Sequence, residues 1–209
     1  MNVIAFDDGP FVHQHRGDVL LVGVVCAGTR LDGVVSGRIR RDGVDSTRRM
    51  IALVQESQFG STIGTVLLQG IAVGGFNVVD VHTLSSSLHV PVLVVMRREP
   101  DLPSVRRALF SASPRARPHV RGAARKWALI ERAGPIELLR ASRRALRRAG
   151  ASGLGATLPR LWVQRVGLSM DEARRIVEAT TVHGQIPEPL RIAHLVAGGI
   201  LSGKSRGRA

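Results

Sequence analysis

The sequence predicts an α/β fold, a mixed β-sheet with helices on both of its faces. Three apolar runs separated by turn residues open the chain, and this pattern predicts an antiparallel meander of strands. Helical and apolar segments then alternate, which is typical of strands joined by crossover helices. With 209 residues, 44% of them hydrophobic, the chain can bury a substantial core.

The strands of the predicted meander span Val3–Phe6, Val19–Cys26 and Leu31–Ile39, the last two joined as a hairpin. From Ser46 the spacing of apolar residues becomes helical. Asp45 stands directly before this helix, in the position of an N-cap.

Strands and helices alternate in the rest of the chain. Ile63–Leu68 and Val90–Met96 carry no charged residue, as expected of central strands. Between them Asn77 is predicted to cap a helix, with Asp80 as its N3 partner. The remaining predicted elements are a short helix beginning near Asp101, an amphipathic helix over Pro135–Ala149, a strand over Leu161–Val166, a helix from Ser169 to about Thr181, and a helix over Leu190–Leu201.

This order of elements, a meander followed by alternating helices and strands, is that of the ribonuclease H-like fold. Residues 1–202 are predicted to form a single domain that contains a basic insertion or helical region over about residues 103–150. Residues 203–209 are predicted to be a flexible basic tail.

The positive charge of the chain is clustered. The formal net charge is +14, and thirteen Arg or Lys lie between Pro103 and Gly150 against two acids. Such a cluster attracts phosphate backbones. On the predicted helix over Pro135–Ala149, the residues Arg140, Arg144 and Arg147 share one face.

Composition excludes several classes of protein. The absence of tyrosine and the aromatic content of 3% argue against recognition by base stacking. Cys26 is the single cysteine, so no internal disulfide can form and zinc-finger spacing is absent. No segment has the length of a membrane span or the pattern of a signal peptide, and we expect a cytoplasmic protein.

Asp7 and Asp8 end the first predicted strand. Adjacent carboxylates repel each other unless a cation or hydrogen-bond donors compensate them. A hard divalent cation such as Mg²⁺ or Mn²⁺ prefers oxygen ligands of this kind. In a basic chain the pair indicates metal-dependent phosphodiester chemistry, while the alternative is a plain Asp-Asp-Gly-Pro turn.

Six collinear stretches support the first of these interpretations. They are Val3–Phe11, Val22–Val25, Leu31–Val34, Asp42–Thr47, Gly75–Asp80 and Pro187–His194. Together they resemble the endonuclease dU family, of archaeal type, in the endonuclease V-like superfamily. The resemblance covers nearly the whole chain except its arginine-rich middle. It implies a ribonuclease H-like fold and a metal-dependent DNA endonuclease that acts near a deaminated base, such as uracil, in DNA repair.

The resemblance also implies three acidic metal ligands. The first maps onto Asp7 and the second, by its place before a helix, onto Asp45. The third falls on Gln69, which departs from the family pattern because an amide lacks the carboxylate's charge. Either Asp80 or Asp8 supplies the missing acid, or the site binds metal weakly or not at all. We therefore predict Asp7, Asp45 and Asp80 as catalytic metal ligands with Asp8 as a further ligand, while helix capping is the alternative for Asp45 and Asp80.

The remaining site predictions concern nucleic acid. Glycines allow the backbone to approach a ligand closely, and a helix start attracts anions. Basic residues after a strand or on a helix face can contact phosphates, although a tight connection and solvated strand ends are the alternatives. The predicted contacts to DNA, or to RNA, are Gly74, Gly75, Asn77, Arg97, Arg98, Arg140, Arg144, Arg147 and Arg191.

Two other functions are compatible with the sequence. One is a non-catalytic nucleic-acid-binding protein on a nuclease fold, in which Gln69 marks lost catalysis. The other is a protein whose basic face binds an acidic partner.

Overall fold

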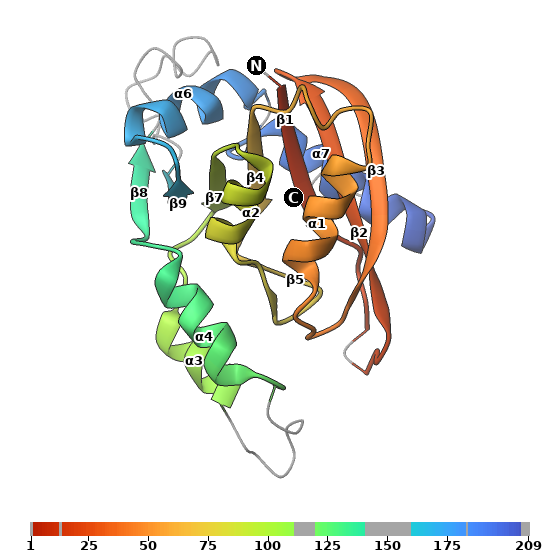
Figure 1. The fold of residues 1–209 in the computed structure, drawn as a ribbon, viewed down its shortest axis with the longest axis vertical. Helices are drawn as coiled ribbons and strands as arrows, with labels where there is room; N and C mark the ends of the chain where they lie inside the picture. The colour runs from red at the N-terminus through yellow and green to blue at the C-terminus, as the bar shows by residue number, and fades with distance from the viewer. Residues whose placement is uncertain (1, 13, 111–119, 141–159, 183, 206–209) are drawn as a thin grey trace.

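A seven-stranded mixed sheet forms the centre of the computed structural model, which describes residues 2–12, 14–110, 120–140, 160–182 and 184–205 (Figure 1). Its strands are β1 (Asn2–Asp8), β2 (Asp18–Ala27), β3 (Arg30–Arg40), β4 (Thr65–Gln69), β7 (Val92–Met96), β8 (Glu137–Arg140) and β9 (Arg160–Val166). Their order across the sheet is β3-β2-β1-β4-β7-β9-β8. The first three strands are antiparallel, β1, β4 and β7 are parallel, and β9 is antiparallel to both of its neighbours. The predicted fold class is confirmed.

Helices cover both faces of this sheet because consecutive residues of its central strands are apolar and point to opposite faces. Val3 and Ala5 of β1 belong to a core cluster with one helix pair, while Ile4 and Phe6 belong to a cluster with the other. The first pair is α6 (Met170–Thr180) and α7 (Glu188–Ser202), and the second is α1 (Ser46–Gln55) and α2 (Val81–Leu88).

A smaller unit lies beside the sheet. The strands β5 (Ala72–Val73) and β6 (Asn77–Val78) form a hairpin, and α3 (Leu102–Phe110) and α4 (Ala123–Arg132) form a helix pair at one end of the molecule (Figure 1). Val78, Leu109 and Ile130 share a third apolar cluster, which joins the β5–β6 hairpin to the α3–α4 helix pair. The helix α4 lies within the region predicted as a basic insertion or helical region but was not predicted as a separate element, although Ala123, Trp127 and Ile130 have helical spacing.

Two predictions about the middle of the chain need correction. Residues 137–140 of the predicted helix over Pro135–Ala149 are instead the strand β8, which pairs with β9. The arginine spacing suggested a helix, but burial of Leu139 between exposed or half-buried neighbours and pairing at the sheet edge outweigh it. Arg140 is exposed on β8, and Arg144 and Arg147 lie outside the described residues.

The other long helices form where they were predicted. At the start of α6 the Ser169 side chain accepts from the Glu172 N–H and Glu172 accepts from the Ser169 N–H, which completes the capping box. The last helix begins at Glu188, two residues earlier than predicted, with Pro189 in its first turn. Within the described ranges no helix is long and apolar enough to cross a membrane.

Candidate active site

The carboxyl ends of β1 and β4 bring Asp7, Asp8 and Gln69 to one edge of the sheet. The register pairs Phe6 of β1 with Leu68 of the parallel β4, so the next residues, Asp7 and Gln69, lie side by side. They line a pocket of about 710 Å³ together with the loop after β1 and residues of α7. The strand-end acid pair therefore lies in an open pocket.

The helix α7 contributes His194 to this pocket. Its Nδ1 atom lies 2.9 Å from Asp7 Oδ2. Gly198 and Ser202 follow at intervals of four residues, which places them on the same side of the helix, and both line the pocket. The Asp7 side chain is 14% exposed, so this contact with the imidazole is largely shielded from solvent.

The two carboxyl groups carry charge that the protein compensates only in part. Burial raises the pKa of Asp7, and the hydrogen bond with His194 opposes that rise. Burial and the neighbouring charge of Asp7 raise the pKa of Asp8 to about 6, against a hydrogen bond from the backbone of Gly74. A cation bound between these groups would relieve both the burial cost and the repulsion.

Gln69 provides a third oxygen. Its Oε1 atom is buried and has no hydrogen-bond partner among the described residues. A buried acceptor without a partner costs about 1–3 kcal/mol. Amide carbonyls are ligands for hard divalent cations, so Asp7, Asp8 and Gln69 fit such an ion. Within the described part of the chain, no group of three or more His, Cys, Asp and Glu could hold a metal, so a site here would include the amide oxygen beside the two carboxylates.

The raised pKa of Asp8 gives a pH-dependent prediction for the metal-free protein. Its folded-state pKa of about 6 exceeds the usual 3.8, so its contribution to stability is present at pH below about 4 and is lost as pH rises through 6. Asp8→Asn should raise the free energy of unfolding by about 1–3 kcal/mol at pH 8 and by little at pH 4. Urea melts in EDTA measure this difference, and an equal gain from Asp18→Asn, at an exposed position, would contradict it.

Asp45 lies outside this pocket. It occupies the N-cap position of α1, as predicted, but its side chain makes no capping hydrogen bond. Its carboxylate accepts from the backbone N–H of Arg40 at 3.2 Å and from Asn77 Nδ2 at 2.7 Å. Asn77 also donates to the Arg40 carbonyl at 2.9 Å and accepts from the Ser46 N–H at 3.1 Å. These bonds tie the start of α1 to the β5–β6 hairpin.

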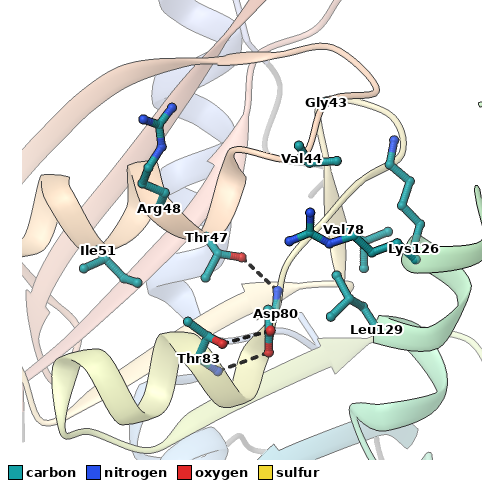
Figure 2. A pocket seen from close by; sticks show the side chains of 11 residues that line it. Gly43, Val44, Thr47, Arg48, Ile51, Val78, Asp80, Thr83, Lys126 and Leu129 are labelled. Carbon is teal, nitrogen blue, oxygen red and sulfur yellow. Dashed lines mark hydrogen bonds between the residues drawn. The ribbon is translucent and has the colours of Figure 1, made fainter. Parts of the chain in front are cut away.

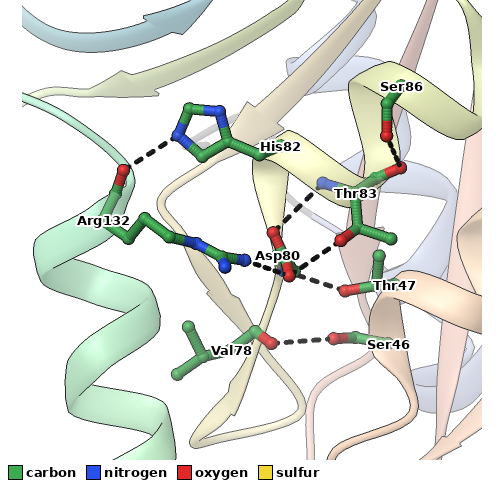
Figure 3. A network of polar contacts seen from close by, with 8 residues as sticks. All are labelled: Ser46, Thr47, Val78, Asp80, His82, Thr83, Ser86 and Arg132. Carbon is green, nitrogen blue, oxygen red and sulfur yellow. Dashed lines mark hydrogen bonds and ion pairs between the residues drawn. The ribbon is translucent and has the colours of Figure 1, made fainter.

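The structure corrects the predicted capping of α2. The N-cap of this helix is Asp80, whereas Asn77, which was predicted to be the cap, belongs to the strand β6. The Asp80 carboxylate accepts from the Thr83 N–H at 3.1 Å, from Thr83 Oγ1 at 2.9 Å and from the Arg132 guanidinium (Figure 3). Asp80 lines a different cavity, between α1 and α4 (Figure 2). The structure therefore separates Asp80 from Asp7 and Gln69.

The predicted glycine connection lies beside the acid pair. Gly74 and Gly75 have positive φ angles of 56° and 83° at the tip of the β5–β6 hairpin. A Cβ atom at Gly75 would lie 2.4 Å from Asp42 Oδ1, so only glycine fits there. The hydrogen bond from Gly74 to Asp8 brings this tip beside the acid pair.

The arginines predicted to contact nucleic acid differ in exposure and in pairing. Arg97 and Arg98 are exposed directly after β7, at the same end of the parallel strands as Asp7. Arg191 is paired with Glu188, with 2.9 Å between Nε and Oε2, so its guanidinium is already engaged.

Sequence reasoning missed Lys204, which also lines the Asp7 pocket. Gly203 ends α7 with a φ of 64°, and the chain then turns back so that a Cβ at Gly198 would lie 3.3 Å from Ser205 Cβ. A glycine after a helical pattern signals such a stop. The direction of the chain beyond it depends on packing that the pattern does not contain.

Comparison with known proteins gives a family and a fold. The sequence model described as endonuclease dU matches residues 1–201. A UPF0215 protein of Deinococcus radiodurans is 44% identical over 207 residues, covering 99% of this chain and 92% of that protein. A UPF0215 protein of Methanothermobacter thermautotrophicus is 38% identical over 213 residues, covering 100% and 92%.

Solved structures show the fold that this chain shares with other proteins. A protein of unknown function from Archaeoglobus fulgidus superposes with a TM-score of 0.73 at 31% identity, covering 95% of this chain and 97% of that one. Endonuclease V of Ciona intestinalis, in complex with inosine-containing DNA, has a TM-score of 0.54 at 12% identity, covering 92% and 82%. At that identity the likeness shows a shared nuclease-like fold.

Proposed function

The chain belongs to the endonuclease dU family, and from this premise we propose that it is a metal-dependent endonuclease that cleaves DNA near a deaminated, uracil-type base. One observation carries the proposal. The pocket at the ends of β1 and β4 combines two carboxyl groups of raised pKa with an amide oxygen that has no partner among the described residues. Acidic and amide oxygens at a strand edge are the ligands that divalent cations prefer.

Asp7, Asp8 and Gln69 would hold one Mg²⁺ or Mn²⁺ ion. When bound, the ion would act as a Lewis acid that stabilises charge developing on the scissile phosphate and the departing oxygen. Asp45 and Asp80 support the fold around the site in this account, because their carboxylates are engaged with Asn77 and with Arg132.

His194 has two roles in the proposed reaction. In the tautomer with a proton on Nδ1, the imidazole donates to Asp7 Oδ2 and fixes the orientation of that carboxylate. The other ring nitrogen, Nε2, is then unprotonated and can accept a proton from a water molecule that attacks the phosphate.

Positive charge near the pocket would hold the DNA backbone. Lys204 lines the pocket itself, and Arg97 and Arg98 are exposed after β7. Contacts of this kind give affinity without sequence information. The complex of the Ciona endonuclease V with DNA supports a nucleic-acid partner for the shared fold.

A nicking assay tests the proposal. Two DNA duplexes differ only in carrying uracil or thymine at one position, and each is incubated with the full-length protein in Mg²⁺, in Mn²⁺ or in EDTA. We expect nicks near the uracil that require metal. Equal binding of both duplexes without nicking at any metal concentration would instead identify a non-catalytic nucleic-acid-binding protein. That is the alternative in which Gln69 marks the loss of catalysis.

A further inference from the structure

A second cavity, which we call the α1–α4 cavity, lies between the start of α1 and the helix α4. It has a volume of about 280 Å³ and is lined by residues of the loop before α1, of α1 and α2, of β6 and of α4 (Figure 2). A short series of hydrogen bonds connects it to the acidic pocket. Lys126 Nζ donates to the Asp42 carbonyl, the Asp42 N–H donates to the Gly74 carbonyl, and the Gly74 backbone donates to Asp8.

The lining of this cavity suits a planar ring. Val44, Ile51, Val78 and Leu129 provide aliphatic surface. Thr47, Asp80 and Thr83 lie together on one side of the cavity, and Leu129 approaches from α4 (Figure 2). Small-molecule sites are mostly apolar with a few placed polar groups. A heterocyclic base matches both the size and the mixed lining.

Asp80 can still accept one hydrogen bond. An ionised carboxylate offers about four lone-pair sites. The Thr83 N–H, the Thr83 hydroxyl and the Arg132 guanidinium occupy three of them (Figure 3). Thr47 Oγ1 accepts from the Asp80 N–H at 2.8 Å, which leaves the proton of this hydroxyl for a ligand. The polar side of the cavity thus offers one acceptor and one donor.

The rim of the cavity is cationic. Arg48 and Arg125 are exposed there, and neither has an ion-pair partner among the residues that the structure describes. Lys126 is 1% exposed and adds a buried ammonium group. The charge of Asp80 is already balanced by Arg132. The cavity therefore has a surplus of positive charge that fits a phosphate group.

We propose that the α1–α4 cavity binds one nucleotide, separate from the acidic pocket, with its base against the aliphatic wall and its phosphate on Arg48 and Arg125. The nucleotide is either a free nucleoside monophosphate or one residue of a bound strand, since both present the same base and phosphate. The proposal goes beyond nuclease activity and does not require it.

Calorimetric titration of the full-length protein in EDTA tests whether the cavity binds a free nucleoside monophosphate. The ligands are nucleoside 5′-monophosphates, the matching nucleosides and inorganic phosphate. We expect at least one monophosphate to bind about tenfold more tightly than phosphate or its own nucleoside. Arg125→Gln should weaken binding of that monophosphate about tenfold and leave binding of the nucleoside unchanged, because it removes a charge-assisted hydrogen bond to the phosphate.

A cavity-filling variant and a charge control complete the test. Val44 is 58% exposed, so Val44→Phe fills the cavity mouth at little risk to the fold. This variant should weaken binding of the monophosphate and of the nucleoside to the same extent. Arg175→Gln removes an exposed arginine from α6, at the opposite end of the molecule from α4, and should change nothing (Figure 1). Asp7→Asn should also leave binding unchanged, which separates this proposal from the nuclease.

The second source is tested with a single-stranded oligonucleotide. If free monophosphates do not bind but Val44→Phe and Arg125→Gln each weaken strand binding about tenfold relative to Arg175→Gln, the nucleotide comes from a strand and the proposal stands. The proposal is overturned if phosphate and monophosphate bind equally well. It is also overturned if Val44→Phe, folded by its melting curve, alters neither mononucleotide nor strand binding.

Discussion

Replacing Asp7 with alanine is expected to reduce metal-dependent cleavage by at least about 10³-fold, equivalent to roughly 4 kcal/mol of transition-state stabilisation. The change removes the carboxylate that lies between Gln69 and His194 at the end of β1. Folding should persist, because burial raises the pKa of this group and its charge therefore costs stability. Single-turnover cleavage, a melting curve and DNA binding in EDTA measure these three properties.

Asp45→Asn and Asp80→Asn are the matched controls for this experiment. Each removes one negative charge from a residue outside the Asp7 pocket and keeps one side-chain oxygen that can accept a hydrogen bond. At Asp80, whose side chain caps α2, asparagine caps about as well as aspartate. Both variants should therefore retain most of the activity. If Asp7→Ala cleaves as well as the wild type, the pocket is not the active site. If Asp45→Asn loses as much cleavage activity as Asp7→Ala, Asp45 belongs to the metal centre.

Gln69→Asp is expected to tighten Mn²⁺ binding by about tenfold or more. The substitution adds a full charge beside Asp7, and unit charges about 4 Å apart interact by roughly 4 kcal/mol near a protein surface. The same charge should destabilise the metal-free protein, because three carboxyl groups would then crowd one pocket. Mn²⁺ titration followed by electron paramagnetic resonance and urea melts in EDTA measure both effects.

The role of Asp80 is decided in the same experiment. Arg132 and Thr83 hold this carboxylate in the α1–α4 cavity, so Asp80→Ala should not alter the gain in Mn²⁺ affinity from Gln69→Asp. A gain that depends on Asp80 would place it in the metal centre. The absence of any gain in both backgrounds would exclude Gln69 from that centre.

The sheet could be predicted because its signals are local. Apolar runs bounded by turn residues mark β1, β2 and β3, and an uncharged run marks the central β4. The strand β8 could not be recognised, because its formation depends on pairing with β9, which lies beyond residue 159. A four-residue edge strand carries little periodicity of its own, so arginine spacing dominated the interpretation.

The candidate site could be predicted only where strand ends define it. Asp7 and Gln69 meet because β1 and β4 are parallel neighbours, which the order of elements already implies. His194 reaches Asp7 across 187 residues of sequence, and Arg132 reaches Asp80 across 52. Such contacts arise from the packing of α7 and α4, and no local pattern contains them.

Crystals soaked in Mn²⁺ test the central claim, a metal centre at the ends of β1 and β4, most directly. Anomalous diffraction at the manganese edge should show a peak in contact with the carboxylates of Asp7 and Asp8 and with Gln69 Oε1. The account is contradicted if the peak lies instead beside Asp45 or Asp80. It is equally contradicted if the Asp7 pocket shows no peak at a Mn²⁺ concentration at which the protein cleaves DNA.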